Sequence, residues 1–251
     1  MNATQNIYDD QLFFNKYYIS RNAANSYNNL VEQPAMSKLY IEDDLTGKSV
    51  LDLGCGYGAN CKNFIEYGAK KVVGVDISEK MLQEAKSKNS HPNIEYISFD
   101  LNQICKINQV HNGFDLIYSS LAFHYVEDFK KLISSIYDLL NNNGILLFSI
   151  MHPVITANIS YIGETPETSY LDPVVVKNYM NSGSRKFKWI LNDVVFYHKP
   201  VSVIINTLIE VGFVITNITE PIPDANGINI APFLAEELDR PSYLIVKATK
   251  N

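Results

Sequence analysis

The stretch Ser49–Gly58 reads SVLDLGCGYG, and further along the chain Val72–Asp76 reads VVGVD. Each is a short apolar strand with a carboxylate at or near its end, and the first opens into a glycine-rich turn. Two such strands with a helix between them form a βαβ unit, the usual cradle for a nucleotide-like ligand. The glycines let the backbone approach a ligand closely. Asp76 lies where its two oxygens can bridge the hydroxyl pair of a ribose.

The details of the turn discriminate between ligands. The glycines stand at Gly54, Gly56 and Gly58, whereas a dinucleotide fingerprint reads Gly-x-Gly-x-x-Gly, in which Ala59 is a tolerated last residue. Asp52, just before the turn, would repel a pyrophosphate and suits a ligand with positive charge, such as S-adenosylmethionine. A P-loop run with its lysine is absent from the sequence.

With the segments that follow, these motifs resemble class I S-adenosylmethionine-dependent methyltransferases, specifically the type 11 small-molecule branch. The resemblance covers about residues 45–150. Its motifs are the cofactor loop at 50–58, the ribose motif and helix start at 74–82, the adenine segment at 99–101, the fourth strand at 114–120 and a helix-turn-strand at 139–148. In that last motif Asn142–Gly144 replaces the family's usual Pro-Gly-Gly turn, and Asn and Gly both tolerate the left-handed conformation.

Strands and helices alternate along the chain. Strands are expected near 49–53, 71–75, 94–98, 114–118 and 144–150, with helices near 59–67, 79–88 and 127–140. This alternation predicts an α/β, Rossmann-like fold, a mostly parallel sheet with helices on both faces. Later come a strand at 194–197, a helix at 201–211 and strands at 213–218 and 243–247. The resemblance implies that the last two complete a seven-stranded sheet with an antiparallel strand at its edge.

We expect one domain over residues 1–251. Residues 1–45 are read as a helical N-terminal lid, 46–150 as the cofactor-binding core and 194–251 as the last strands and helix. Residues 151–193 contain proline, glycine and aromatic side chains but little periodicity. Long irregular segments of this kind are often functional, and we interpret this one as a substrate cap.

Composition excludes several classes of function. The net charge is −6 with no block of lysine or arginine, which argues against nucleic acid as the main partner. We find neither an apolar run long enough for a membrane span nor a secretory signal. The odd number of cysteines, three, favours a reducing cytoplasm. Monomer and homodimer both stay open.

The resemblance implies a role for each motif residue. The glycine loop would hold the methionine moiety, Asp76 the ribose hydroxyls, and a pair of apolar side chains the adenine faces. Helix capping by Asp76 and plain core packing by Met81 are the alternatives. The cofactor-binding candidates are Asp52, Gly54, Cys55, Gly56, Gly58, Asp76, Ile77, Met81, Asp100, Leu101 and Ser119.

The implied reaction is an in-line displacement at the sulfonium methyl that leaves S-adenosylhomocysteine, so the protein mainly aligns the reactants. A hydroxyl or ammonium acceptor would profit from a general base near neutral pKa. His124 and His152 are the leading candidates and His198 is the third; a structural hydrogen bond is the alternative for each. The substrate-binding candidates are Tyr8, Tyr17, Tyr18, Arg21, His124, Tyr125, His152, Tyr197 and His198.

The acceptor is expected to be a small organic molecule with an oxygen or nitrogen nucleophile. The motif of DNA amino-methyltransferases is missing after the fourth strand, where Ser119–Ala122 reads SSLA, and no acidic cluster suggests a metal. Two other functions compete. An NAD-dependent oxidoreductase would share Asp76 but explains neither Asp52 nor Asp100. A non-catalytic S-adenosylmethionine-binding module would keep the loop without turnover.

Overall fold

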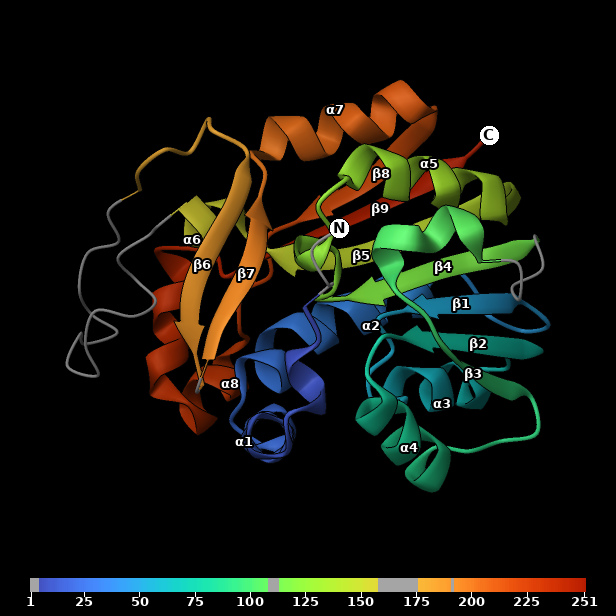
Figure 1. Ribbon diagram of the computed structural model, residues 1–251, viewed down its shortest axis with the longest axis horizontal. Helices are drawn as coiled ribbons and strands as arrows, with labels where there is room; N and C mark the ends of the chain where they lie inside the picture. The colour runs from blue at the N-terminus through green and yellow to red at the C-terminus, as the bar shows by residue number, and fades with distance from the viewer. Residues whose placement is uncertain (1–4, 108–112, 158–175, 191) are drawn as a thin grey trace.

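The structure, a computed structural model, describes residues 5–107, 113–157, 176–190 and 192–251 of the 251-residue chain. The described residues form a seven-stranded sheet in the order β3-β2-β1-β4-β5-β9-β8 and a separate two-stranded sheet (Figure 1). The main strands are β1 (Ser49–Leu53), β2 (Lys71–Asp76), β3 (Ile94–Ser98), β4 (Phe114–Ser120), β5 (Leu140–Met151), β8 (Phe213–Thr219) and β9 (Tyr243–Lys250). Only β9 among them runs antiparallel, one place in from the edge, between β5 and β8. The predicted α/β fold with a mostly parallel sheet is confirmed.

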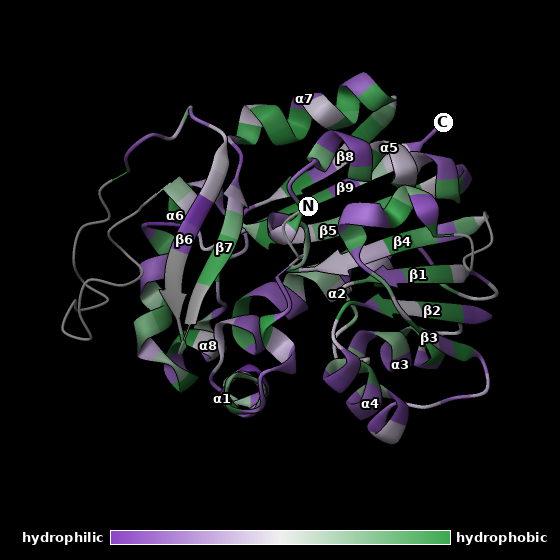
Figure 2. Ribbon diagram, in the orientation of Figure 1, coloured by the Kyte–Doolittle hydropathy of each residue, from purple (hydrophilic) through white to green (hydrophobic). Residues whose placement is uncertain are grey.

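Helices cover both faces of this sheet. One face carries α2 (Gln33–Ile41), α3 (Ala59–Glu66) and α4 (Glu79–Lys88), and the other carries α5 (Phe129–Leu139) and α7 (Val201–Val211). Strands covered on both sides lose alternation and become continuously apolar. This is why β2 has the unbroken run Val72–Val75 and β1 is apolar on both sides of Asp52, and why both strands show much green in Figure 2.

Local capping signals set the ends of these helices. Ser78 precedes α4, and its Oγ accepts a hydrogen bond from the Met81 N–H at 3.2 Å. Gly212 follows α7 in the left-handed conformation, with φ of +111°. Both are positions where these residue types stabilise a helix end. The expected helices at 79–88 and 201–211 therefore have the bounds that the sequence predicts.

The N-terminal region, which the sequence predicts to be helical, contains several short helical elements. It divides into η1 (Ile7–Asp9), α1 (Gln11–Asn22), a π-helical turn η2 (Asn28–Glu32) and α2. Phe13 of α1 is fully buried against Val194 and Phe196, which come from a distant part of the chain. The helix therefore packs against the second, smaller sheet.

That smaller sheet is the hairpin of β6 (Gly183–Trp189) and β7 (Asn192–His198). The expectation of irregular chain is wrong for β6, because its alternation includes charged residues that suit an exposed two-stranded ribbon. Within the expected cap, residues 158–175 and 191 lie outside the described residues. The hairpin crosses the end of the sheet to which the parallel strands point (Figure 1).

Short elements complete the described chain: η3 (Leu101–Lys106), η4 (Phe123–Tyr125), α6 (Pro153–Ala157), α8 (Ala225–Ile230) and η5 (Pro232–Leu238). None of the helices in the described ranges has the length and apolar character needed to cross a membrane.

Candidate functional site

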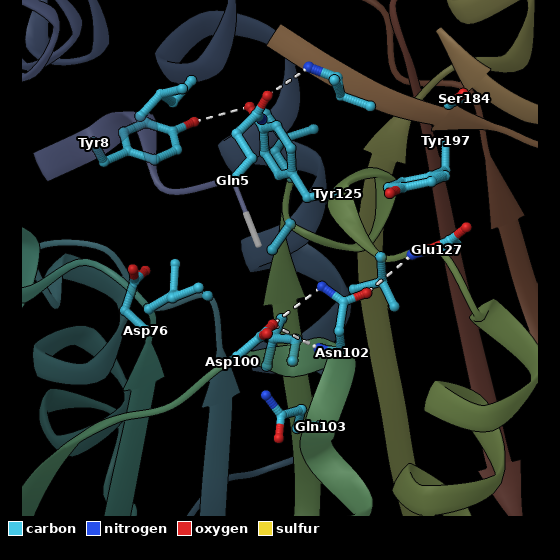
Figure 3. Close-up of a pocket in the computed structure, with 18 of the residues that line it drawn as sticks. Gln5, Tyr8, Asp76, Asp100, Asn102, Gln103, Tyr125, Glu127, Ser184 and Tyr197 are labelled. Carbon is cyan, nitrogen blue, oxygen red and sulfur yellow. Dashed lines mark hydrogen bonds between the residues drawn. The ribbon is translucent and has the colours of Figure 1, made fainter. Parts of the chain in front are cut away.

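A cavity of about 1210 Å³ lies at the carboxyl ends of the central strands, between them and the hairpin. N-terminal residues, strand ends, η3, the segment after β4 and the hairpin all contribute to its wall (Figure 3). The sequence-predicted residues that line it are Tyr8, Tyr17, Gly54, Gly56, Asp76, Ile77, Met81, Asp100, Leu101, Tyr125, Tyr197 and His198. Those that do not line it are Asp52, Cys55, Gly58, Ser119, Tyr18, Arg21, His124 and His152.

Asp76 stands at the end of β2 and faces the cavity (Figure 3). Its Oδ2 accepts the Gly56 N–H and its Oδ1 accepts the Ser78 N–H, each at 2.8 Å. A carboxylate offers about four lone-pair sites, so capacity remains for two further donors. Burial raises the pKa of Asp76, while these backbone N–H groups act in the opposite direction.

The glycine loop uses its own N–H groups internally. Gly54 and Cys55 both donate to the Val75 carbonyl, at 2.7 and 3.0 Å, and Gly58 donates to the Cys55 carbonyl at 3.0 Å. The Gly56 N–H is taken by Asp76. A pyrophosphate site needs such donors aimed at the ligand. These four N–H groups are therefore not available to a pyrophosphate.

Two loop glycines are required for different reasons. Gly54 has φ of +77°, and a side chain there would collide with Ala122 across the cavity edge. Gly58 has φ of +79°, and its missing side chain leaves room for the Tyr96 ring. Gly54 therefore shapes the cavity wall, whereas Gly58 lies beneath it as the residue before α3.

Asp52 lies under the loop, only 1% exposed. Its Oδ2 accepts a hydrogen bond from the Cys61 thiol at 3.3 Å, and its Oδ1 has no partner among the described residues. Burial raises the pKa of Asp52 to about 7. Any influence of Asp52 on a ligand is thus exerted through charge, from behind the cavity wall.

Asp100 lines the cavity, whereas Ser119 lies in the sheet behind it. Asp100 Oδ1 accepts the Asn102 N–H at 2.9 Å, and Asn102 Oδ1 in turn accepts the Glu127 N–H at 3.1 Å (Figure 3). Ser119 is buried and its hydroxyl donates to the Leu53 carbonyl at 2.8 Å. Asp100 thus caps η3, Asn102 ties η3 to the segment after β4, and Ser119 joins β4 to β1.

Arg21 belongs to a buried polar cluster that reaches the cavity through Ser120. Its Nη2 donates to Ser120 Oγ at 3.4 Å, and its Nη1 is buried with no partner among the described residues. Ser120 Oγ itself donates to Glu32 Oε1 at 2.9 Å. A buried guanidinium nitrogen without an acceptor is costly, so Nη1 keeps the capacity to donate to an anionic group, while the Glu32 carboxylate lies near the same guanidinium.

Four tyrosines from the N-terminal segment, the segment after β4 and the hairpin line the cavity. The Tyr8 and Tyr17 rings meet edge to face at 4.9 Å between centroids, and Tyr197 lies across from Tyr125 on the hairpin side (Figure 3). Tyr18 lies apart from the cavity, where its hydroxyl accepts a hydrogen bond from Lys88 Nζ at 3.0 Å.

The three histidine candidates have different surroundings. His124 is buried with its ring edge-on to Phe196, and burial lowers its pKa to about 3. His152 Nε2 lies 2.9 Å from Glu220 Oε1, away from the cavity. His198 lines the cavity.

Both ring nitrogens of His198 are used, Nδ1 with Thr156 Oγ1 at 2.7 Å and Nε2 with the Tyr179 carbonyl at 2.8 Å. Burial lowers the pKa of His152 and of His198 as well. The described partners of His152 and His198 suit structural roles, whereas His124 Nδ1 is buried with no hydrogen-bond partner among the described residues.

Sequence reasoning missed several residues of the wall. Lys199 follows β7, Ser120 ends β4, and Leu121 has φ of +55°, a strained value for a residue with a branched side chain. For Ser120 the signal was its position beside the other strand-end residues. For Lys199 and Leu121 the sequence carries no signal, because the hairpin had not been recognised and leucine does not favour positive φ.

Comparisons with known proteins agree with this geometry. A family model described as a methyltransferase domain matches residues 44–194. The chain is 36% identical to an uncharacterized protein of Haemophilus influenzae, over 100% of this chain and 99% of that protein. A crystal structure of an S-adenosylmethionine-dependent methyltransferase from Mesorhizobium loti is similar with a TM-score of 0.76 and 36% identity, over 87% of this chain and 97% of that one. A Listeria monocytogenes protein gives a TM-score of 0.74 and 35% identity, over 87% and 100%.

Proposed function

The chain belongs to the S-adenosylmethionine-dependent methyltransferases, and we propose that it methylates an oxygen or nitrogen atom of a small organic acceptor. The observation that carries this proposal is one continuous cavity whose wall contains both Asp76 and Asp100 and the tyrosines Tyr125 and Tyr197. Its volume of about 1210 Å³ exceeds the roughly 300–1,000 Å³ of typical ligand sites, so a cofactor and a second molecule have room together. The net charge of −6 supports a small acceptor over a nucleic acid.

Asp76 is assigned to the ribose hydroxyls of the cofactor. Its carboxylate faces the cavity and keeps acceptor capacity after the two backbone hydrogen bonds described above. Ile77 and Met81 line the cavity next to it and are assigned to the adenine faces, with Asp100 and Leu101 at the adenine edge.

The methionine end of the cofactor carries an ammonium and a carboxylate. Arg21 is assigned to the carboxylate, because its Nη1 is buried without an acceptor and its Nη2 reaches Ser120, which lines the cavity. This revises the expectation that Arg21 binds the acceptor. The ammonium suits the loop, whose N–H groups are used internally and whose carbonyls can accept hydrogen bonds.

When bound, the cofactor supplies a sulfonium methyl group, and transfer breaks its S–C bond while a C–O or C–N bond forms to the acceptor, which releases a proton if it was neutral. The residues of the chain orient the acceptor and exclude water. Positioning of this kind can contribute about 7–11 kcal/mol to lowering the barrier. The aromatic side chains of Tyr8, Tyr17, Tyr125 and Tyr197 provide the surface that would position the acceptor. A catalytic role of His124, His152 or His198 stays a prediction.

The test is calorimetric titration with S-adenosylhomocysteine and, in parallel, with NADH. Binding of the former alone is expected, and a panel of hydroxyl and amine acceptors is then assayed with radiolabelled methyl groups. Binding of NADH alone, or failure of every class of small acceptor in a protein that binds the cofactor, would contradict the proposal.

A further inference from the structure

Lys199 lines the cavity next to the hairpin, and its charged side chain is buried. It follows β7 directly and precedes α7, and it is only 7% exposed. Lysine is rarely buried unless its charge is paired. Because Lys199 lies on the hairpin side of the cavity, a group that paired with its charge would belong to the acceptor.

The hydrogen bonds of Lys199 leave one donor unassigned. Its Nζ donates to the Val126 carbonyl at 2.9 Å and to the Tyr197 carbonyl at 3.2 Å. An ammonium group has three N–H donors. Across the described parts of the chain, no carboxylate forms an ion pair with Lys199. Two neutral carbonyls therefore orient the group without neutralising it.

Burial makes this charge expensive. Removal from water lowers the pKa of Lys199 to about 8, against the attraction of Asp128 and Glu127. The rings of Phe129 and Tyr197, with centroids 5.5 and 5.6 Å from Nζ, compensate part of the cost. A ligand that brought a negative charge to the unassigned N–H would offset the rest.

We propose that the methyl acceptor is a small carboxylic acid whose carboxylate binds Lys199 Nζ, an inference that rests on the function proposed above. A carboxylate fits better than a phosphate, because only one donor is unassigned and Glu127 lines the same cavity. A monoanion meets less repulsion from that side chain than a dianion. The tyrosines nearby would contact the body of the acid.

The experiment uses matched acids and amides on protein saturated with S-adenosylhomocysteine. The probes are acetate and acetamide, benzoate and benzamide, and phenylacetate and phenylacetamide, titrated by calorimetry. At least one acid is expected to bind about ten-fold more tightly than its amide, the effect of one hydrogen bond to a charged group. If no acid binds more tightly than its amide, the proposal is wrong.

Variants identify the residue responsible. Lys199→Met is expected to abolish the acid-over-amide preference, while Lys199→Arg keeps most of it. Lys186→Met removes an exposed lysine of β6 that does not line the cavity, and it should leave the preference unchanged. A preference that survives in Lys199→Met overturns the assignment.

Two readouts keep the outcomes distinct. S-adenosylhomocysteine binding is measured first, and its absence in the wild-type protein would contradict the proposed function and not the lysine assignment alone. In the wild-type protein labelled at lysine Cε, the preferred acid should move the Lys199 resonance and raise its pKa, whereas the matching amide should do neither. A Lys199 resonance that ignores a bound acid contradicts the inference even if Lys199→Met fails to fold.

Discussion

The hydroxyl of Tyr8 lies 2.9 Å from the hydroxyl of Tyr125, so a hydrogen bond joins the start of the described chain to the segment after β4 (Figure 3). Its neighbours are anchored too. Asp9 Oδ1 accepts the Ser78 hydroxyl at 2.6 Å, and Gln5 Oε1 accepts the Val195 N–H at 2.7 Å. The N-terminal segment thus bridges the cofactor end of the cavity and the hairpin.

Tyr8→Phe removes the hydrogen bond between the two hydroxyls and keeps the Tyr8 ring. A neutral hydrogen bond contributes about 0.5–1.5 kcal/mol, so affinity for S-adenosylhomocysteine is expected to fall roughly two- to ten-fold, through faster dissociation. Stopped-flow fluorescence measures the two rates. Tyr67→Phe, on an exposed ring elsewhere, is the control. Unchanged dissociation would show that the N-terminal segment does not retain the cofactor.

Asp76→Asn tests the ribose assignment. The loss of a hydrogen bond to a charged group costs about 1.5–3 kcal/mol, which corresponds to roughly 10- to 150-fold weaker binding of S-adenosylhomocysteine. Calorimetry measures the affinity, and a urea unfolding curve checks that the loop contacts to Gly56 and Ser78 have not been lost with the fold. Asp138→Asn, an exposed change on α5, serves for comparison. Normal affinity in a folded Asp76→Asn protein would exclude the assignment.

Arg21→Met should separate two ligands that differ only at the methionine end. S-adenosylhomocysteine has the carboxylate assigned to Arg21, whereas 5′-methylthioadenosine lacks it. The variant is expected to bind the former about ten-fold or more weakly and the latter with unchanged affinity. Calorimetric titration gives both constants. An equal loss for the two ligands would mean that Arg21 acts by supporting the fold around Ser120.

The cofactor half of the site follows from local sequence. Strands such as Val72–Asp76 are apolar because both faces are covered, and positive φ at Gly54 and Gly58 demands glycine, so pattern and structure agree. Asp76 could be placed because a strand end fixes the position of the residue there.

The acceptor half depends on tertiary contacts that no local pattern encodes. Lys199 reaches the cavity only because the β6–β7 hairpin folds over the sheet, and a two-stranded ribbon with charged residues gives a weak signal. Asp52 was expected in the cofactor site, but its burial behind the loop could not be read from its spacing. The role of Glu32 as a buried acceptor was missed because Glu32 lies in a π-helical turn of a region that was expected only to be helical.

Glu32→Gln is expected to destabilise the protein, although Glu32 does not itself line the cavity. The Glu32 carboxylate is fully buried and acts only as an acceptor. Its donors are Ser120 and Ser149 on Oε1, and Asn28 and Gln33 on Oε2. An amide nitrogen in either position faces two donors, so the free energy of unfolding should fall by about 1–3 kcal/mol.

Urea unfolding measures that loss. Glu66→Gln, at an exposed site on α3, should change the free energy of unfolding by no more than about 0.5 kcal/mol. If Glu32→Gln is as stable as the wild type, the carboxylate is not held by these four donors.

His124 should make the protein less stable as the pH falls. Its folded pKa of about 3 lies below the value of about 6.5 for an unfolded histidine, because burial disfavours the charged ring and Lys199 adds repulsion. Between these two values the unfolded chain binds a proton that the folded chain does not. The free energy of unfolding therefore decreases with falling pH, by up to about 1.4 kcal/mol per pH unit from this residue, and the loss begins near pH 6.5.

His124→Gln removes the ring that takes up a proton on unfolding. The free energy of unfolding of this variant should therefore fall less steeply than that of the wild type below pH 6.5. Urea unfolding at pH 7.5, 6.5 and 5.5 gives the difference between the two proteins, which cancels the contributions of His152, His198 and the carboxylates. His91→Gln, at an exposed site, should parallel the wild type. In the folded wild-type protein the His124 ring should show no titration in NMR spectra above pH 5. A midpoint near 6.5 would mean that the His124 ring is solvated in the folded protein, contrary to this expectation.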